Sequence, residues 1–301
     1  MSTRVAVVLA YAGMCLIWGT TWLGIKIALQ YMPPIAGAGV RFVIAGLALY
    51  AVAATQGQVR PPREVPWKLV LVLAGLMFGL NYVLTYTAET RLSSGLVAVL
   101  FGTLPFFMFA FGGLAGEKAT PRIWFGTFVA FAGVAVISLA GQVRGAPLFA
   151  LAAICAAASS AVASLYARRH AHHDPLLTLP PAMLLGGVAM LAIGLAAESV
   201  NWTRAVEPHS IYAVLYLALV GSCLAFFLNL WVLKHLEAWI VGLTALIIPV
   251  IAVAVGIVFG GETFTTRELG GSLLVVIGMT VALTSSKTVA SEMAEAEREV
   301  P

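Results

Sequence analysis

The chain has 301 residues, of which 61% are hydrophobic and only 10% are charged, with a formal net charge of +4 at pH 7. Soluble domains carry about 25% charged residues, so this chain lacks the polar surface that a water-soluble fold needs. Together with a mean hydropathy of +0.98, this composition excludes most soluble classes and indicates a membrane protein.

Apolar runs long enough to cross a bilayer recur along the whole chain. A crossing helix needs about 20 residues, and continuous rather than alternating runs favour helices over barrel strands. No cleavage site follows the first run, so we expect no cleaved signal peptide. The sequence predicts an all-α polytopic membrane protein with ten spans, at residues 5–29, 35–54, 67–88, 94–115, 121–140, 146–167, 176–197, 209–233, 238–260 and 268–285.

The first span contains the stretch "LIWGTTWLGIK", which ends at Lys26 near the predicted outer surface. A lysine there can extend its amine to the headgroups at little cost. Trp18 and Thr21 are candidate substrate-binding residues that line a pathway through the protein. Alternatively, Trp22 anchors the helix at the interface and the threonines bond back to their own helix. Both interpretations stay open.

Arg41 lies about two helical turns inside the second span, and a cation at that depth indicates a functional site with a partner. The nearest acidic candidate is Glu89, at the end of the third span. We hypothesise that Arg41 or Lys26 pairs with Glu89 and stabilises one state of a gate. The alternatives are a static pair, or an Arg41 side chain that extends outward.

The third span carries polar and aromatic groups at helical spacing. Asn81 and Thr85 are four residues apart, as are Tyr82 and Tyr86, so the four side chains lie on neighbouring faces of one helix. Amide and phenol groups are costly against lipid, so we expect this stripe to line a cavity and bind substrate.

Two further spans carry weaker signals of the same kind. Asn229 and Trp231 in the eighth span are candidate substrate-binding residues. Ser160 in the sixth span, with Ser159 and Ser164 beside it, is another. Serines at these positions equally well allow two helices to pack closely.

Other chemistry is poorly supported. Cys15, Cys155 and Cys223 each lie alone in a separate apolar span. The segment "RRHAHHDP" has no rigid one-face ligand spacing, so we expect a solvated loop and no metal. Motifs for nucleotide hydrolysis, metalloproteases and serine esterases are missing. We therefore predict no catalytic residue, no cofactor and no enzyme.

The basic residues predict the orientation. With a cytoplasmic N-terminus, eleven of the 17 lysines and arginines fall on the cytoplasmic side and five on the outer side. This excess follows the positive-inside rule and places both termini in the cytoplasm, in an inner (plasma) membrane. The basic charge therefore needs no nucleic acid to explain it. Residues 287–301 are expected to form a polar cytoplasmic tail.

The chain also repeats itself. At an offset of 144 residues Leu84 aligns with Leu228 and Pro105 with Pro249, and at 145 "GEKAT" aligns with "GETFT". Five spans is an odd number, so the second repeat must enter the membrane in the opposite direction. We expect two inverted five-helix repeats, residues 1–143 and 144–286, a pattern typical of alternating-access transporters. The two prolines are candidate hinges because each removes a helical hydrogen bond.

These segments resemble those of the drug/metabolite transporter superfamily, EamA type. The resemblance rests on "IWGTTWLGIK", on "MPPIAGAGVRF" entering the second span, and on the paired Pro…Gly-Glu-x-x-Thr segments. It covers about residues 5–285 and implies a ten-helix, two-repeat fold that often exports amino acids and related metabolites. The spacing from Pro105 to Glu117 is one residue shorter than that from Pro249 to Glu262.

We therefore expect alternating-access export of small metabolites, with amino acids or related zwitterions first. A cavity without a central formal charge suits such solutes. Because no carboxylate lies near a span centre, we expect facilitated movement down a gradient, or coupling through groups that the sequence does not identify. Efflux of hydrophobic drugs or other metabolites, or a non-transporting membrane enzyme or scaffold, are the alternatives. The expected partners are a small-molecule substrate and the lipid bilayer; the sequence makes no prediction of the oligomeric state.

Overall fold

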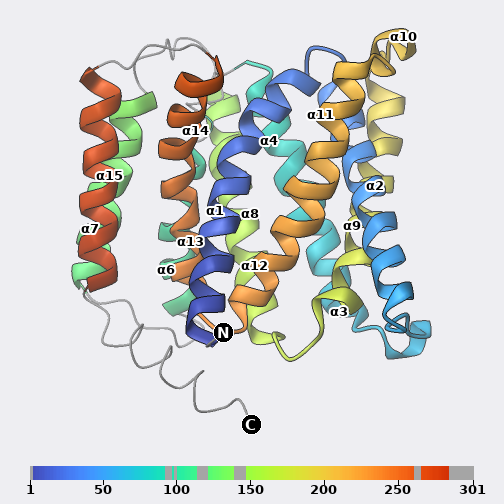
Figure 1. Cartoon of the computed structure of the whole chain (residues 1–301), viewed down its shortest axis with the longest axis horizontal. Coiled ribbons are helices and arrows are strands. Elements are labelled where there is room, and N and C mark those ends of the chain that lie inside the picture. The colour runs from blue at the N-terminus through green and yellow to red at the C-terminus, as the bar shows by residue number, and fades with distance from the viewer. Residues whose placement is uncertain are drawn as a thin grey trace.

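The protein is a bundle of long helices that stand side by side (Figure 1). The computed structural model describes residues 3–91, 97, 100–113, 121–138, 147–260 and 266–284, and no strand occurs within these ranges. α1 (Thr3–Ala28) begins at the face of the bundle that is lowest in Figure 1, and α15 (Thr266–Thr284) ends at the same face. The repeated segments Gly116–Thr120 and Gly261–Thr265 and the tail at 287–301 lie outside the described residues.

The other elements follow in chain order. They are α2 (Pro34–Thr55), η1 (Pro62–Glu64), α3 (Trp67–Val72), η2 (Leu73–Leu80), α4 (Asn81–Glu89), α6 (Leu104–Gly113), α7 (Pro121–Ser138), α8 (Pro147–Arg169), α9 (Pro175–Ala197), α10 (Trp202–Ala205), α11 (Pro208–Ala218), η3 (Leu219–Leu224), α12 (Ala225–Leu233), α13 (Ala238–Gly242) and α14 (Thr244–Gly260).

The helices follow the predicted spans closely. Six helical stretches in the described part are long and apolar enough to cross a membrane: Thr3–Ile25, Pro34–Thr55, Trp67–Glu89, Pro147–Arg169, Pro175–Ala197 and Pro208–Leu233. Many large apolar side chains on the outside of the bundle are exposed, including Leu16, Leu47 and Leu185. A soluble protein rarely exposes so much apolar surface, so the bundle is a multi-pass membrane protein.

Two of the membrane-spanning helices contain a π-helical stretch. η2 lies between α3 and α4, and η3 lies between α11 and α12, so each span stays helical but changes its hydrogen-bonding register. η2 ends at Leu80 and η3 ends at Leu224. These positions are 144 residues apart, which equals the offset of the sequence repeat.

α2 and α9 pack backbone against backbone. A Cβ on Gly39 would lie 2.5 Å from the nitrogen of Leu191, and one on Gly187 would lie 2.7 Å from the nitrogen of Val43. Gly187 follows Gly39 by 148 residues, and Leu191 follows Val43 by the same 148. The contact is thus repeated with the two helices exchanged, as in a two-fold interface.

α7 and α15 make a second reciprocal contact, at one end of the bundle (Figure 1). A Cβ on Gly133 would lie 2.6 Å from the oxygen of Gly271, and one on Gly278 would lie 2.5 Å from the oxygen of Gly126. Both partners shift by 145 residues between the two contacts. Only a residue without a Cβ allows such close approach of two backbones.

The fourth and ninth spans differ from expectation because each is interrupted. α6 begins only at Leu104, so Pro105 lies in its first turn rather than in a helix interior. A proline is tolerated in a first turn because the amide there has no helical partner. In the ninth span the helix is interrupted by a turn at Leu243, between α13 and α14. Pro249 lies inside α14.

Candidate functional site

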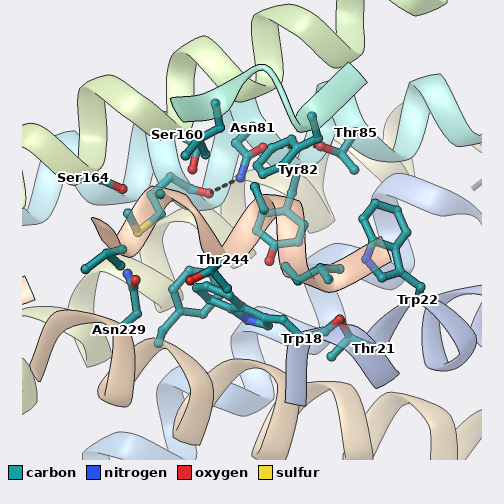
Figure 2. Close-up of a pocket in the computed structure, with 18 of the residues that line it drawn as sticks. Trp18, Thr21, Trp22, Asn81, Tyr82, Thr85, Ser160, Ser164, Asn229 and Thr244 are labelled. Atoms are coloured by element: carbon teal, nitrogen blue, oxygen red, sulfur yellow. Dashed lines mark hydrogen bonds between the residues drawn. The ribbon is translucent and has the colours of Figure 1, made fainter. Parts of the chain in front are cut away.

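A cavity of about 120 Å³ lies between the helices of the bundle (Figure 2). A single water needs roughly 10–15 Å³ of such space, so the cavity has room for several waters or a small solute. Its walls come from most of the long helices. They are formed by Trp18, Thr21, Trp22, Ile25, Arg41, Met77, Asn81, Tyr82, Thr85, Phe101, Leu104, Met108, Ser160, Ser164, Phe226, Asn229, Val241, Gly242, Thr244, Ala245 and Ile248.

Most of the predicted substrate-binding residues lie on these walls. In Figure 2, the polar groups of α4 lie across the cavity from the tryptophan and threonine of α1. The predicted residues that line the cavity are Trp18, Thr21, Asn81, Tyr82, Thr85, Ser160 and Asn229.

Two predicted residues lie elsewhere. Trp231 packs against His235, with ring centroids 4.3 Å apart, and does not line the cavity. It follows Asn229 by two residues, and two residues turn a helix by about 200°, so the two side chains leave opposite faces. Tyr86 is buried one turn beyond Tyr82 and contacts Arg41 instead.

The first helix presents its aromatic face to the second half of the chain. The Trp18 Nε1–H donates to the Gly221 oxygen at 3.3 Å, and its ring packs edge-on against Phe226 at 5.2 Å. Trp18 is therefore a protein-facing residue. The Thr21 hydroxyl donates to the Trp18 oxygen at 2.7 Å, so the expectation that the threonine bonds back to its helix is also correct.

The polar stripe of the third span is ordered by its own hydrogen bonds. The Asn81 amide donates to the Met77 oxygen at 3.3 Å, and the Thr85 hydroxyl donates to Asn81 Oδ1 at 3.3 Å. In the sixth span the serines divide between two roles. Ser159 donates to the Leu76 oxygen at 2.8 Å and joins two helices, whereas Ser160 and Ser164 face the cavity.

Arg41 is enclosed at 1% exposure, yet its side chain contributes to the cavity wall. It lies seven residues from the start of α2, about 10 Å along the helix. Nε donates to Ser222 Oγ at 2.7 Å, Nη2 to the Gly221 oxygen at 3.1 Å and Nη1 to the Tyr86 hydroxyl at 3.5 Å. The guanidinium carbon also lies 5.3 Å from the Tyr82 ring centroid, within cation–π range.

The expected direct pair between Arg41 and Glu89 is not formed in this conformation. Glu89 Oε1 is buried and accepts no hydrogen bond from the described residues. The guanidinium instead donates to two acceptors in the π-helical η3, Ser222 Oγ and the Gly221 oxygen, and to the Tyr86 hydroxyl. The Lys26 side chain lies outside the described residues.

Arg41 also corrects the expectation of a cavity without a formal charge, because it puts a cation on the wall. Most of the other unforeseen lining residues come from the interrupted fourth and ninth spans: Phe101, Leu104, Met108, Val241, Gly242, Thr244, Ala245 and Ile248. Met77 and Phe226, from the third and eighth spans, were also not predicted. The prolines of these spans were the one available signal, since a broken helix exposes side chains from both of its pieces.

The histidine-rich loop has a local structural role. Asp174 Oδ1 accepts from the Leu176 backbone amide at 2.8 Å and caps α9. The His172 and His173 rings pack at 4.0 Å, and burial and the neighbouring histidines lower the pKa of His173. Within the described ranges no group of three metal-ligating side chains is arranged to hold an ion.

Comparisons with known proteins agree on one family. The model of the EamA-like transporter family matches twice, at residues 5–139 and 144–284. The "Uncharacterized inner membrane transporter YedA" of Escherichia coli K12 is 30% identical over 267 residues, which are 86% of this chain and 84% of that protein. The "Probable amino-acid metabolite efflux pump" of Salmonella typhimurium LT2 is 28% identical over 279 residues, 87% and 90% of the two chains. A crystal structure at 20% identity has a TM-score of 0.84 and covers 95% of this chain and 100% of its own, which supports the fold alone.

Proposed function

This chain belongs to the EamA-like transporter family, and on that premise we propose that it exports small metabolites across the inner membrane by alternating access. The proposed substrates are amino acids or related zwitterions. The observation that carries the proposal is the cavity between the helices, whose walls combine polar and aromatic side chains from both halves of the chain. Such a cavity at the interface of two repeats is where carriers of this kind bind their substrates.

We further propose ten membrane-spanning helices arranged as two inverted five-helix repeats, at residues 1–143 and 144–286. The two matches to one family model support this division. The reciprocal contacts of α2 with α9 and of α7 with α15 also support it. In each pair of helices the same contact occurs twice, with the roles of the two helices exchanged. The excess of basic residues on one side supports cytoplasmic termini.

An amino-acid substrate is supported by the chemistry of the wall. Amide and hydroxyl groups of Asn81, Thr85 and Ser160 can bond polar ends, while Trp18 and Phe226 offer apolar surface. The name of the Salmonella relative, an amino-acid metabolite efflux pump, points to the same class.

A paired gate remains a proposal for a second conformation. In that second conformation, Glu89 would form an ion pair with Arg41 or Lys26. Exchanging the charges of Arg41 and Glu89 together should then restore part of the transport that each single change removes. No restoration would contradict the gate.

Counterflow in proteoliposomes tests the proposed function. Vesicles that contain purified full-length protein and unlabelled amino acid should accumulate the labelled amino acid above protein-free vesicles. A panel of all twenty amino acids, with ethidium as a hydrophobic drug, separates the alternatives. Uptake of ethidium alone would favour drug efflux, and no uptake of any solute would contradict a carrier.

A further inference from the structure

We propose that Arg41 binds the carboxylate of the transported solute, so that the cavity selects its substrates by their carboxylate and not by their ammonium group. This inference rests on the proposed carrier function and adds the recognition chemistry. Arg41 is suited to the role because it reaches the cavity wall, with its guanidinium carbon 5.3 Å from the Tyr82 ring centroid.

The guanidinium is held in a fixed position but is not saturated. Three of its five N–H groups donate to Ser222, Gly221 and Tyr86. The remaining two, one on each terminal nitrogen, have no acceptor in the described part of the chain. A carboxylate fits two such donors in parallel, because the planar fork of arginine matches the spacing of its oxygens.

The charge of Arg41 also lacks a bonded counter-ion. No aspartate or glutamate is among the described residues that line the cavity, and Glu89 Oε1 accepts no hydrogen bond from the described residues. A buried cation without a paired anion is unfavourable. A carboxylate that enters with the solute supplies the missing charge, and this gives the substrate a reason to bind there.

The described residues of the cavity wall include no carboxylate that could pair with the ammonium group of a substrate. Its partners would be neutral oxygens and the faces of Trp18 and Tyr82, close to a positive charge. The ammonium of an amino acid is therefore tolerated rather than required. We infer that 2-oxo acids bind about as well as the matching amino acids, whereas amino-acid amides and amines do not.

Thermal stabilisation of the purified full-length protein in detergent tests this inference with three probes of one shape: leucine, 4-methyl-2-oxopentanoate and leucinamide. The two carboxylates should raise the Tm at similar concentrations and leucinamide should not. In Arg41→Gln the concentration needed for half of the effect should rise about 100-fold, because a charge-assisted bidentate contact is lost. Arg41→Lys keeps the charge but loses the fork, and should lie between the two.

Ala189→Gln is the matched control, since Ala189 occupies the α9 position 148 residues after Arg41 and should leave the stabilisation unchanged. If Arg41→Gln does not fold, the loss in Arg41→Lys carries the test. Equal stabilisation by leucinamide, no stabilisation by either carboxylate, or full stabilisation of both Arg41 variants overturns the inference. Carboxylate binding that depends on Arg41, without any counterflow, would support the site and reject the carrier function.

Discussion

Where α2 carries Arg41, the equivalent position of α9 carries Ala189, and this difference recurs around the cavity. At an offset of 144 residues Tyr82 corresponds to Phe226 and Thr85 to Asn229, and all four side chains line the cavity. In the proposed two-repeat arrangement, the two halves repeat their geometry but not their chemistry. The helix contacts are reciprocal, whereas the cation and the phenol belong to the first half.

This contrast separates two kinds of constraint. Contacts between backbones, such as those of the glycines in α7 and α15, must be kept in both halves for the helices to approach each other. The cavity wall is free to diverge because the proposed solute would bind one asymmetric site. The predictions that follow test the shared geometry first and the divergent chemistry afterwards.

The largest effect is expected at the reciprocal glycine contact. Gly133→Ala and Gly278→Ala should each destabilise the protein by about 1–3 kcal/mol, because the new methyl group meets backbone atoms that cannot move aside. The two losses should be alike if the contact is two-fold. Thermal unfolding of the purified variants measures them.

Gly270→Ala in the same helix is the control. A Cβ there would meet no atom within 4 Å, so the substitution should be neutral or stabilise by up to about 1 kcal/mol. A clear loss at Gly270, or a loss at only one of the paired glycines, would contradict the two-fold packing.

A smaller effect is expected from the polar stripe of α4. Ala225 lies 144 residues after Asn81, at the corresponding position of the second half, so Asn81→Ala makes the two positions identical. Losing one hydrogen-bonding amide from the wall should raise the KM for amino-acid counterflow about 10-fold, equivalent to about 1.4 kcal/mol. Trp231→Phe, away from the cavity, should leave the KM unchanged. Equal effects of the two substitutions would show that the stripe does not contact the solute.

The smallest effect should separate the two prolines. Pro105 lies in the first turn of α6, where alanine fits equally well. Pro249 lies inside α14, where alanine would restore a helical hydrogen bond and stiffen the rod. Pro249→Ala should therefore slow turnover more than Pro105→Ala in counterflow. A slower turnover in Pro105→Ala alone would reverse the assignment of the hinge.

The sequence predicts the long helices and most of the cavity wall for a simple physical reason. Bilayer thickness fixes the length of each span, and polar groups such as Asn81 and Thr85 avoid lipid, so periodicity alone indicates the face that points inward. α2, α3–α4 and α11–α12 accordingly begin and end within two residues of the predicted spans.

The partners of Arg41 could not be predicted in this way. A search for acidic side chains finds Glu89, whereas the guanidinium uses the Ser222 hydroxyl and the Gly221 carbonyl in π-helical η3. Backbone acceptors leave no trace in the residue types, and nothing in the composition of residues 219–224 marks a change of helical register. Trp231 was misplaced because two residues of helix reverse the direction of a side chain.

The central claim is that one cavity between the two halves opens alternately to each side of the membrane. Ser160→Cys, in a chain whose native Cys15, Cys155 and Cys223 are replaced by alanine, places a single thiol on the cavity wall. In sealed proteoliposomes of known orientation, a membrane-impermeant maleimide should label this thiol from either side, and transported amino acid should slow both reactions. Labelling from one side only, or from neither, would contradict alternating access.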